Sequence, residues 1–265
     1  MTGSAKQDSR FAEHASALAE LCYPVRCWGC GRRWPGVGEW LCEECEEDLL
    51  GHGLLRCGRC GQFVGPGALV GGGCWECRDA RFSFASAVAA VPYSEAARQM
   101  VHRLKFGGHD YLARLMGGLM AEVARQERLD ALCDVIVGVP LHWRRRLRRG
   151  YDQGALLAGE VSQGLGLPLA GRAVSRRRST VPQTGLSRAA RVRNVADGFT
   201  VPGPADVRER TVLVVDDVLT TGATADACAA ALHEAGVRRV FVLTFARAGK
   251  PAPAGILSGG STDDV

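Results

Sequence analysis

The sequence VLVVDDVLTTGATADA, residues 212–227, decides the fold. An apolar run typical of a buried strand leads into two adjacent carboxylates, then into a turn rich in hydroxyl groups and glycine, and then into an alanine-rich helix. Strands that feed helices in this way build parallel sheets, and such sheets bind ligands beyond the carboxyl ends of their strands. We therefore expect residues 212–227 to form one ligand-binding edge of a sheet.

The chain alternates between predicted strands and helices from about residue 82 onward. The expected elements, in order along the chain, are a strand at 85–93, helices at 94–106 and 110–126, a strand at 134–140, a helix at 154–166, a strand at 211–217, a helix at 224–237 and a strand at 238–247. Ser94 is the expected cap of the first helix, and Gly236 should end the last one. This order predicts an α/β fold, with a mainly parallel sheet covered by helices.

Composition and charge limit the protein classes. The 265 residues are 46% hydrophobic and 23% charged, as expected for a globular chain, and we predict neither a signal peptide nor a membrane span. We expect a cytoplasmic protein. The net charge of +5 is distributed unevenly, because residues 142–195 contain 12 arginines and only two acids. This basic belt predicts an anionic ligand or partner.

Eight of the eleven cysteines form four CxxC pairs in the first third of the chain. The pairs are Cys27/Cys30, Cys42/Cys45, Cys57/Cys60 and Cys74/Cys77. Two such pairs complete the tetrahedral sulfur shell that zinc prefers, so we expect two structural zinc ions. Sequential and cross-braced pairings are both allowed by the spacing. Either arrangement leaves no open coordination position for a substrate.

The two carboxylates and the turn beside them suit a phosphorylated sugar. Asp216 and Asp217 can only accept hydrogen bonds when ionised, and are placed to hold two vicinal hydroxyls of a ribose. Residues 220–224 offer backbone N–H groups, a threonine hydroxyl and a positive helix terminus to a phosphate. Lys105, in the segment KFGG, could reach a phosphate or could equally be a surface side chain.

The stretch VLVVDDVLTTGAT resembles the phosphoribosyl pyrophosphate (PRPP) signature of type I phosphoribosyltransferases. Over residues 22–247 the chain is closer to the ComF family of competence-associated, phosphoribosyltransferase-like proteins. Supporting stretches are LKFGGHDYLARLM (104–116), VGVPLHWRRRLRRGYDQGALLA (137–158), VPQTGLSRAARVRNVADGF (181–199) and the cysteine-rich front. The resemblance implies a phosphoribosyltransferase-like domain at 81–247, after a zinc-ribbon domain at 22–80. A segment at 1–21 and a tail at 248–265 complete the expected organisation.

The resemblance also implies roles for individual residues. Asp216 and Asp217 would hold the ribose hydroxyls and act as the catalytic pair, and Mg²⁺ would accompany PRPP. The other implied PRPP contacts are Val218, Leu219, Thr220, Thr221, Gly222, Ala223 and Thr224 for the phosphate turn, and Val139, Pro140, Leu141 and Arg149 for the pyrophosphate. Residues 176–194 stand where the family has a mobile flap. The family pattern RGFNQ is RGYDQ here, so that Asp152 brings either an unfavourable charge near a pyrophosphate or a helix cap.

Several functions fit these features. The basic belt could serve the pyrophosphate, or it could bind single-stranded DNA through Arg144, Arg145, Arg148, Arg177, Arg188 and Arg191. The ComF resemblance favours DNA uptake in natural competence, with single-stranded DNA and the competence DNA-import helicase as partners. The alternatives are a salvage or metabolic phosphoribosyltransferase with an unidentified nitrogen acceptor and a PRPP-sensing regulator without turnover. The sequence leaves open whether the protein is an enzyme.

Overall fold

The computed structural model describes residues 26–34, 40–70, 73–176, 198–203 and 206–249. Its centre is a four-stranded sheet in the order β5-β10-β9-β6, in which every neighbouring pair is parallel. The strands are β5 (Ser86–Pro92), β6 (Val135–Gly138), β9 (Thr211–Leu219) and β10 (Arg239–Arg247). All four carboxyl ends therefore meet at one edge of the sheet, as the sequence predicted; we call it the carboxyl edge.

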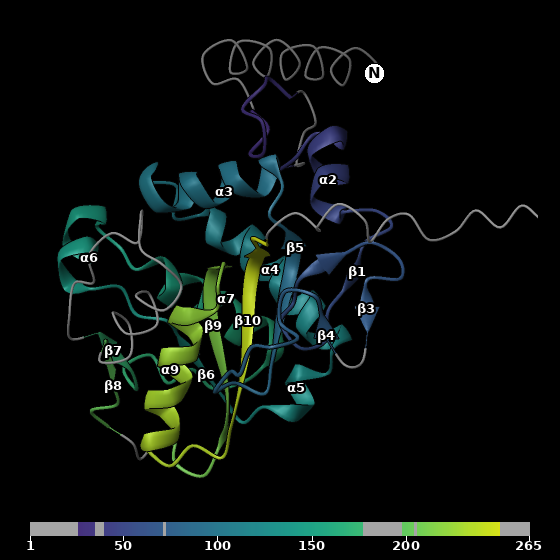
Figure 1. The fold of residues 1–265 in the computed structure, drawn as a ribbon. Helices are drawn as coiled ribbons and strands as arrows, with labels where there is room; N and C mark the ends of the chain where they lie inside the picture. The colour runs from purple at the N-terminus through teal and green to yellow at the C-terminus, as the bar shows by residue number, and fades with distance from the viewer. Residues whose placement is uncertain (1–25, 35–39, 71–72, 177–197, 204–205, 250–265) are drawn as a thin grey trace, which may run out of the picture.

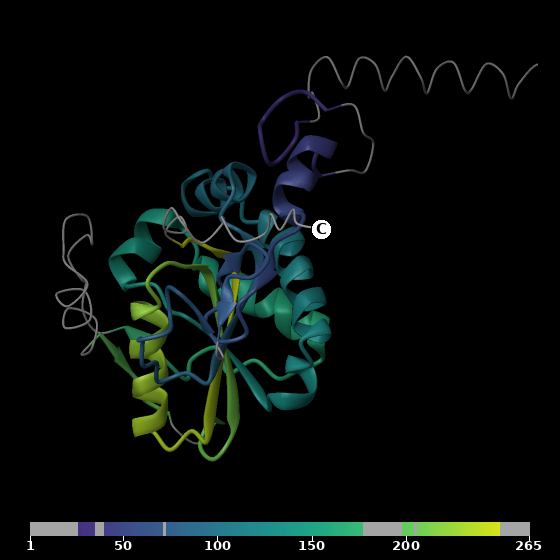
Figure 2. The ribbon, with the colours of Figure 1, turned by 45° about the vertical axis from the view of Figure 1, so that its right-hand side comes forward.

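Helices cover both faces of this sheet (Figures 1 and 2). The helices are α3 (Glu95–Phe106), α4 (Leu112–Gln126), α5 (Leu129–Leu132), α6 (Trp143–Arg149), α7 (Gln153–Leu165) and α9 (Ala223–Glu234). One core packs α3, α4 and α7 against strand residues such as Leu213 and Leu243. The other packs α9 against residues such as Val212 and Val242. Because side chains alternate along a strand, neighbouring residues of β9 belong to different cores.

The periodicity of the apolar residues explains these helices. In α3, Ala97, Met100, Val101 and Leu104 are buried on one face, and the Ser94 side chain accepts a hydrogen bond from Ala97 N at 3.3 Å. The predicted cap is therefore confirmed. Helix α6 was not predicted, because its residues WRRRLRR present no apolar face and none of them is buried.

The cysteine-rich front contains little regular structure. Helix α2 (Glu43–Leu50) begins directly after Cys42, and two short antiparallel pairs follow it. These pairs are β1 (Leu55–Arg56) with β2 (Phe63–Val64), and β3 (Leu69–Val70) with β4 (Gly73–Cys74). Cys60 forms an isolated parallel bridge with Ala87 at the free side of β5. The second half of the front is therefore attached to the central sheet.

A further antiparallel pair, β7 (Ser175–Arg176) with β8 (Phe199–Thr200), flanks the segment expected to be a flap. The Ser175 and Thr200 hydroxyls lie 2.9 Å apart across this pair. Residues 177–194 of the expected flap lie outside the described residues, as do the expected N-terminal segment 1–21 and residues 250–265 of the expected tail. None of the described helices has both the length and the apolar composition needed to cross a membrane.

Candidate functional site

The two acids lie within the last four residues of β9, which extends two residues beyond the strand end at 217 that the sequence predicted. The strand continues through Val218 to Leu219, and these residues pair with Ala246 and Arg247 of β10. The other neighbour, β6, stops earlier, with its last residue Gly138 paired to Val215. Asp216 and Asp217 therefore project past the end of β6, at the carboxyl edge.

Asp217 is held on the face of the sheet that carries α3 and α7. Only 4% of Asp217 is exposed. Lys105 Nζ of α3 lies 2.6 Å from Asp217 Oδ1, and Gln153 Nε2 of α7 donates to Asp217 Oδ2 at 3.1 Å. Arg149 Nη1 in turn donates to Gln153 Oε1 at 2.8 Å. Both carboxylate oxygens of Asp217 are thus engaged by protein groups, and a sugar hydroxyl would have to displace one of them.

Asp216 lies on the opposite face, near Arg176 and Cys228 of α9, and is partly exposed. Burial of its carboxyl group, reinforced by the negative charge of Asp217, raises the pKa of Asp216 to about 7. The charges of Lys105 and Arg176 act in the opposite direction. Asp216 is therefore less buried than Asp217 but still shielded from water, and its charge changes near neutral pH.

The turn after β9 combines a left-handed glycine with the amino end of a helix. Gly222 has φ of 83°, in the left-handed region, and a Cβ atom there would meet Phe82 Cε1 at 3.1 Å. Helix α9 begins at the next residue, so its first N–H groups face this turn without partners inside the helix. The Thr221 hydroxyl accepts a hydrogen bond from Ala223 N at 3.4 Å. Strand, turn and helix terminus are thus arranged as the sequence predicted.

A cavity of about 290 Å³ adjoins this turn. It is lined by residues 221–223 and Asp226 on one side and by residues 79–82 on the other. The lining does not include Asp216 or Asp217. The charged residues of the lining are two acids, Asp79 and Asp226, and one arginine, Arg81.

The turn after β6 carries the expected pyrophosphate residues. Val139 N donates to Val215 O at 2.8 Å, and Leu141 N donates to Asp152 Oδ2 at 3.0 Å. The other oxygen of Asp152 accepts from Gly154 N and Ala155 N at 3.0 and 3.2 Å, which caps α7. An asparagine has only one acceptor oxygen and could not accept from both sides. The departure from the family pattern is therefore explained by this turn and cap.

Helix α6 presents the arginines of the basic belt at the surface. Trp143 is 57% exposed and Leu147 is 79% exposed. The Arg144 guanidinium lies 5.2 Å from the centroid of the Trp143 ring. Arg149 differs from the others, because its guanidinium stacks on Phe106 at 4.6 Å and joins the network of Asp217. Of the arginines expected to bind DNA, Arg144, Arg145 and Arg148 lie on α6, whereas Arg177, Arg188 and Arg191 lie outside the described residues.

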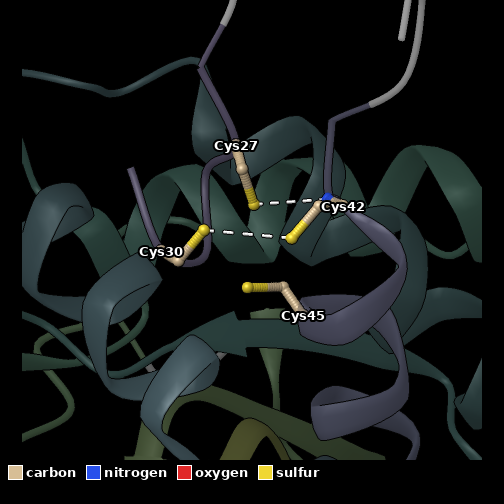
Figure 3. A group of neighbouring side chains, drawn as sticks. All are labelled: Cys27, Cys30, Cys42 and Cys45. Carbon is tan, nitrogen blue, oxygen red and sulfur yellow. Dashed lines mark hydrogen bonds between the residues drawn. The ribbon is translucent and has the colours of Figure 1, made fainter. Parts of the chain in front are cut away.

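The eight paired cysteines gather into two groups in sequential order. The first tetrad is Cys27, Cys30, Cys42 and Cys45, and the second tetrad is Cys57, Cys60, Cys74 and Cys77. Figure 3 shows the thiols of the first tetrad turned toward one another, with Cys42 N donating to Cys27 Sγ at 3.3 Å. Within each tetrad all four sulfur atoms lie within 4.8 Å of one another. The cross-braced pairing that the sequence left open is thus not the one observed.

The spacing of the sulfur atoms suits a tetrahedral ion. Sγ–Sγ distances are 3.8 Å for Cys30–Cys42, 3.7 Å for Cys57–Cys77 and 3.5 Å for Cys60–Cys74. A tetrahedral zinc ion with Zn–S bonds of about 2.3 Å holds its sulfur ligands about 3.8 Å apart. Both tetrads can therefore hold a metal ion.

Sequence reasoning missed several residues that organise this site. It did not single out Gln153 or Arg247. For Lys105 it left two roles open, a phosphate contact or a surface side chain. Each is a single polar residue near the end of a helix or strand, so no motif marks it. Arg247 is only 4% exposed although it is the last residue of β10. A buried charge at a strand end could have been suspected only from the apolar run VFVLTFA before it.

Comparisons with known proteins agree with this architecture. A family model described as "Phosphoribosyl transferase domain" matches residues 151–254. DNA utilization protein YhgH of Escherichia coli (strain K12) is 32% identical over 246 residues, covering 86% of this chain and 99% of that protein. Competence protein F of Haemophilus influenzae is 30% identical over 231 residues, covering 85% and 98%.

One solved structure, an allosteric regulatory enzyme of purine biosynthesis, is 22% identical to this chain. The match covers 50% of this chain and 26% of that one, with a TM-score of 0.35, which is too low to support an inference from it.

Proposed function

This chain belongs to the ComF family of phosphoribosyltransferase-like proteins, and from that premise we propose that it binds PRPP with Mg²⁺ at the carboxyl edge of its sheet. One observation carries the proposal. The acids at the end of β9 project past β6, next to a left-handed glycine turn that opens α9. A carboxylate that can accept hydrogen bonds from the pentose hydroxyls of PRPP therefore lies beside a row of backbone N–H groups that can bind its 5-phosphate.

Different residues of the site would bind different parts of PRPP. Asp216 is the acid available to a ribose hydroxyl, and residues 220–224 would receive the 5-phosphate. Asp217 would take the second hydroxyl only after Lys105 had moved from its carboxylate. Residues 139–141 and Arg149 would face the pyrophosphate. Mg²⁺, bound mainly by oxygen atoms of the ligand, would offset the charge of the pyrophosphate.

Calorimetric titration of Mg²⁺–PRPP into the zinc-loaded protein tests this proposal. We expect binding by the wild-type protein and at least a tenfold loss of affinity in Asp216→Asn, because the amide accepts more weakly than the carboxylate. Asp130→Asn is the matched control, since Asp130 is an exposed acid of α5, which precedes β6. Absence of binding by the wild-type protein, or equal affinities in the two variants, would refute the proposal.

Whether bound PRPP reacts is a separate question. In a transferase, a nitrogen nucleophile would attack C1 of the ribose and pyrophosphate would leave, without a covalent link to the protein. A salvage or metabolic enzyme and a PRPP-sensing regulator need the same binding site. Pyrophosphate release, measured across nucleobases and small amines, distinguishes them: release with one acceptor identifies an enzyme, and no release with any acceptor favours the regulator.

A second candidate function is single-stranded DNA binding through α6. Its exposed arginines could follow the phosphate backbone, and the exposed Trp143 ring could stack on a base. The names of the relatives, DNA utilization protein and competence protein F, favour this second function. A role in DNA uptake, alongside the competence DNA-import helicase, is part of this second proposal.

Fluorescence anisotropy with a labelled oligonucleotide tests the DNA proposal. We expect binding that weakens as salt rises, and a smaller salt dependence in the double variant Arg145→Gln/Arg148→Gln. Arg239→Gln, at the amino end of β10, is the control. Absence of DNA binding at low salt would refute the DNA proposal and leave a small anionic ligand as the partner of the basic belt. If PRPP competes with the oligonucleotide, the two ligands bind at the same surface.

We further propose that both tetrads hold zinc and that the protein works in the reducing cytoplasm. The sulfur spacing supports the first statement. Cysteines that serve as zinc ligands must be reduced, which supports the second.

A further inference from the structure

Arg247, the last residue of β10, connects the second tetrad with the turn after β9. On the metal side, Arg247 Nε donates to the carbonyl oxygen of Cys60 at 3.0 Å. Its Nη2 lies 3.4 Å from Oε2 of Glu76, which stands between the ligands Cys74 and Cys77. The guanidinium thus contacts both CxxC pairs of the second tetrad, and its side chain is only 3% exposed.

The same guanidinium holds the backbone of the turn. Arg247 Nη1 donates to Leu219 O at 3.1 Å and also to Thr220 O and Ala248 O. In a planar trans peptide the C=O and N–H groups point in opposite directions, and the described residues contain no cis peptide. Holding the carbonyls of Leu219 and Thr220 toward Arg247 therefore turns the N–H groups of Thr220 and Thr221 away from it. These N–H groups belong to the stretch that would receive the 5-phosphate.

We propose that Arg247 is a positioning residue through which metal in the second tetrad orders the phosphate turn. Metal would fix the Cys57–Cys60 pair, and the Cys60 carbonyl and Glu76 hold the guanidinium. The guanidinium in turn holds the Thr220 carbonyl and shares the Leu219 carbonyl with Ala248 N, which donates to it at 2.9 Å. Preorganised N–H groups bind a phosphate without the cost of ordering a loop. The inference rests on the proposed PRPP site and extends it to a dependence on one of the two tetrads.

The first tetrad has a corresponding arginine that lacks this connection. Arg103 Nη1 of α3 donates to Cys27 O at 3.2 Å and to Trp28 O at 2.7 Å. Like Arg247, it holds carbonyl oxygens of a CxxC pair. Its other end belongs to a helix and not to the turn after β9. A substitution of Arg103 is therefore the matched control: it removes the hydrogen bonds that hold a CxxC pair without touching the turn after β9.

Calorimetric titrations with two separate probes, ribose 5-phosphate and pyrophosphate, test the inference. In Arg247→Met we expect at least a tenfold loss of affinity for ribose 5-phosphate, and pyrophosphate affinity within twofold of wild type. Arg103→Met should leave both affinities within twofold. Zinc content, measured in every variant, should stay at two ions. A folded Arg247→Met protein that retains its affinity for ribose 5-phosphate overturns the inference, as does an equal loss for both probes.

The wild-type protein provides a test that does not depend on the folding of Arg247→Met. Zinc is removed stepwise with a chelator, and both probes are titrated at each zinc content. Loss of the zinc of the second tetrad should abolish ribose 5-phosphate binding before pyrophosphate binding, and loss of the zinc of the first tetrad should affect neither. Ribose 5-phosphate binding that survives loss of the second zinc overturns the inference. If the zinc-loaded wild-type protein binds neither PRPP nor ribose 5-phosphate, the proposed function itself fails.

Discussion

The two cysteine tetrads have the same ligands but very different surroundings. In the first tetrad Cys30 is exposed, and its neighbour Arg32 pairs with Glu44 at the surface. In the second tetrad all four cysteines are buried. Its members reach the central sheet through the bridge from Cys60 to Ala87 and through Arg247.

On the proposal made above, one kind of metal site would serve two purposes in this chain. The first tetrad lies against α3, where Arg103 holds its carbonyl oxygens, and its three buried cysteines belong to the core that α3, α4 and α7 form with the sheet. The second tetrad forms a small buried cluster of its own with Val64 and Ala68, and it contacts the carbonyls of the candidate phosphate turn through Arg247. We therefore expect changes in the second tetrad to cost more stability and to affect ligand binding.

The largest expected effect is that of removing one ligand from each tetrad. Cys60→Ser should lower the zinc content from two ions to one and reduce the free energy of unfolding by at least about 3 kcal/mol, since metal binding energy is folding energy. Cys30→Ser should also remove one zinc but cost less stability. Metal analysis and urea unfolding measure both changes. Equal losses of stability would remove the distinction between the tetrads.

A finer test uses Gly31 and Gly61, which directly follow corresponding CxxC pairs and both have positive φ. A Cβ at Gly61 would meet the backbone of Ala87 at 3.1 Å, whereas one at Gly31 would meet the guanidinium of Arg103, a side-chain end that can shift, at 2.7 Å. We expect Gly61→Ala to cost about 2–4 kcal/mol, because the backbone of β5 cannot yield, and Gly31→Ala about 1–2 kcal/mol. Denaturant unfolding of the two variants gives the comparison, and the opposite order would contradict it.

The pH dependence of binding separates the acid pair from the tetrads. The raised pKa of Asp216, about 7, means that its carboxyl is protonated below neutral pH and ionised above it. Affinity for ribose 5-phosphate should therefore rise as pH increases through 7, and Asp216→Asn should show only the titration of the ligand phosphate near pH 6.

Cys30→Ser should retain the wild-type midpoint in these titrations. A wild-type profile that coincides with that of Asp216→Asn would exclude Asp216 as the titrating group.

The smallest effect is expected at the surface of the first tetrad. Burial opposes ionisation of the Cys30 thiol, but hydrogen bonds from Arg32 lower its pKa to about 6. Arg32→Gln should raise that pKa, so that protons compete better for the sulfur. The pH at which zinc dissociates from the first tetrad should then rise by less than about one unit. A colorimetric zinc assay across a pH series measures the shift, and an unchanged release pH would show that Arg32 does not influence the site.

The predictable parts of the molecule are those with strong local patterns. The apolar runs of β9 and β10 and the amphipathic pattern of α3 lead directly to the observed elements. Helix α6 was missed because a run of arginines has no buried face to reveal it.

The less predictable parts depend on packing between distant segments. Spacing alone could not choose the cysteine pairing, since every CxxC pair is alike. The strand was expected to end at the acids, whereas pairing of Val218 and Leu219 with β10 continues it. For the same reason the opposite orientations of Asp216 and Asp217 were not foreseen. Contacts such as that of Lys105 with Asp217 join residues far apart in sequence, and no local sequence pattern predicts them.

Hydrogen exchange of the zinc-loaded wild-type protein, with and without ribose 5-phosphate, tests the central claim most directly. We predict slower exchange at residues 220–224 and at the Cys57–Cys60 pair when the ligand binds, with no change at the Cys27–Cys30 pair. Unchanged exchange at residues 220–224, or equal protection of the two cysteine pairs, would contradict the account.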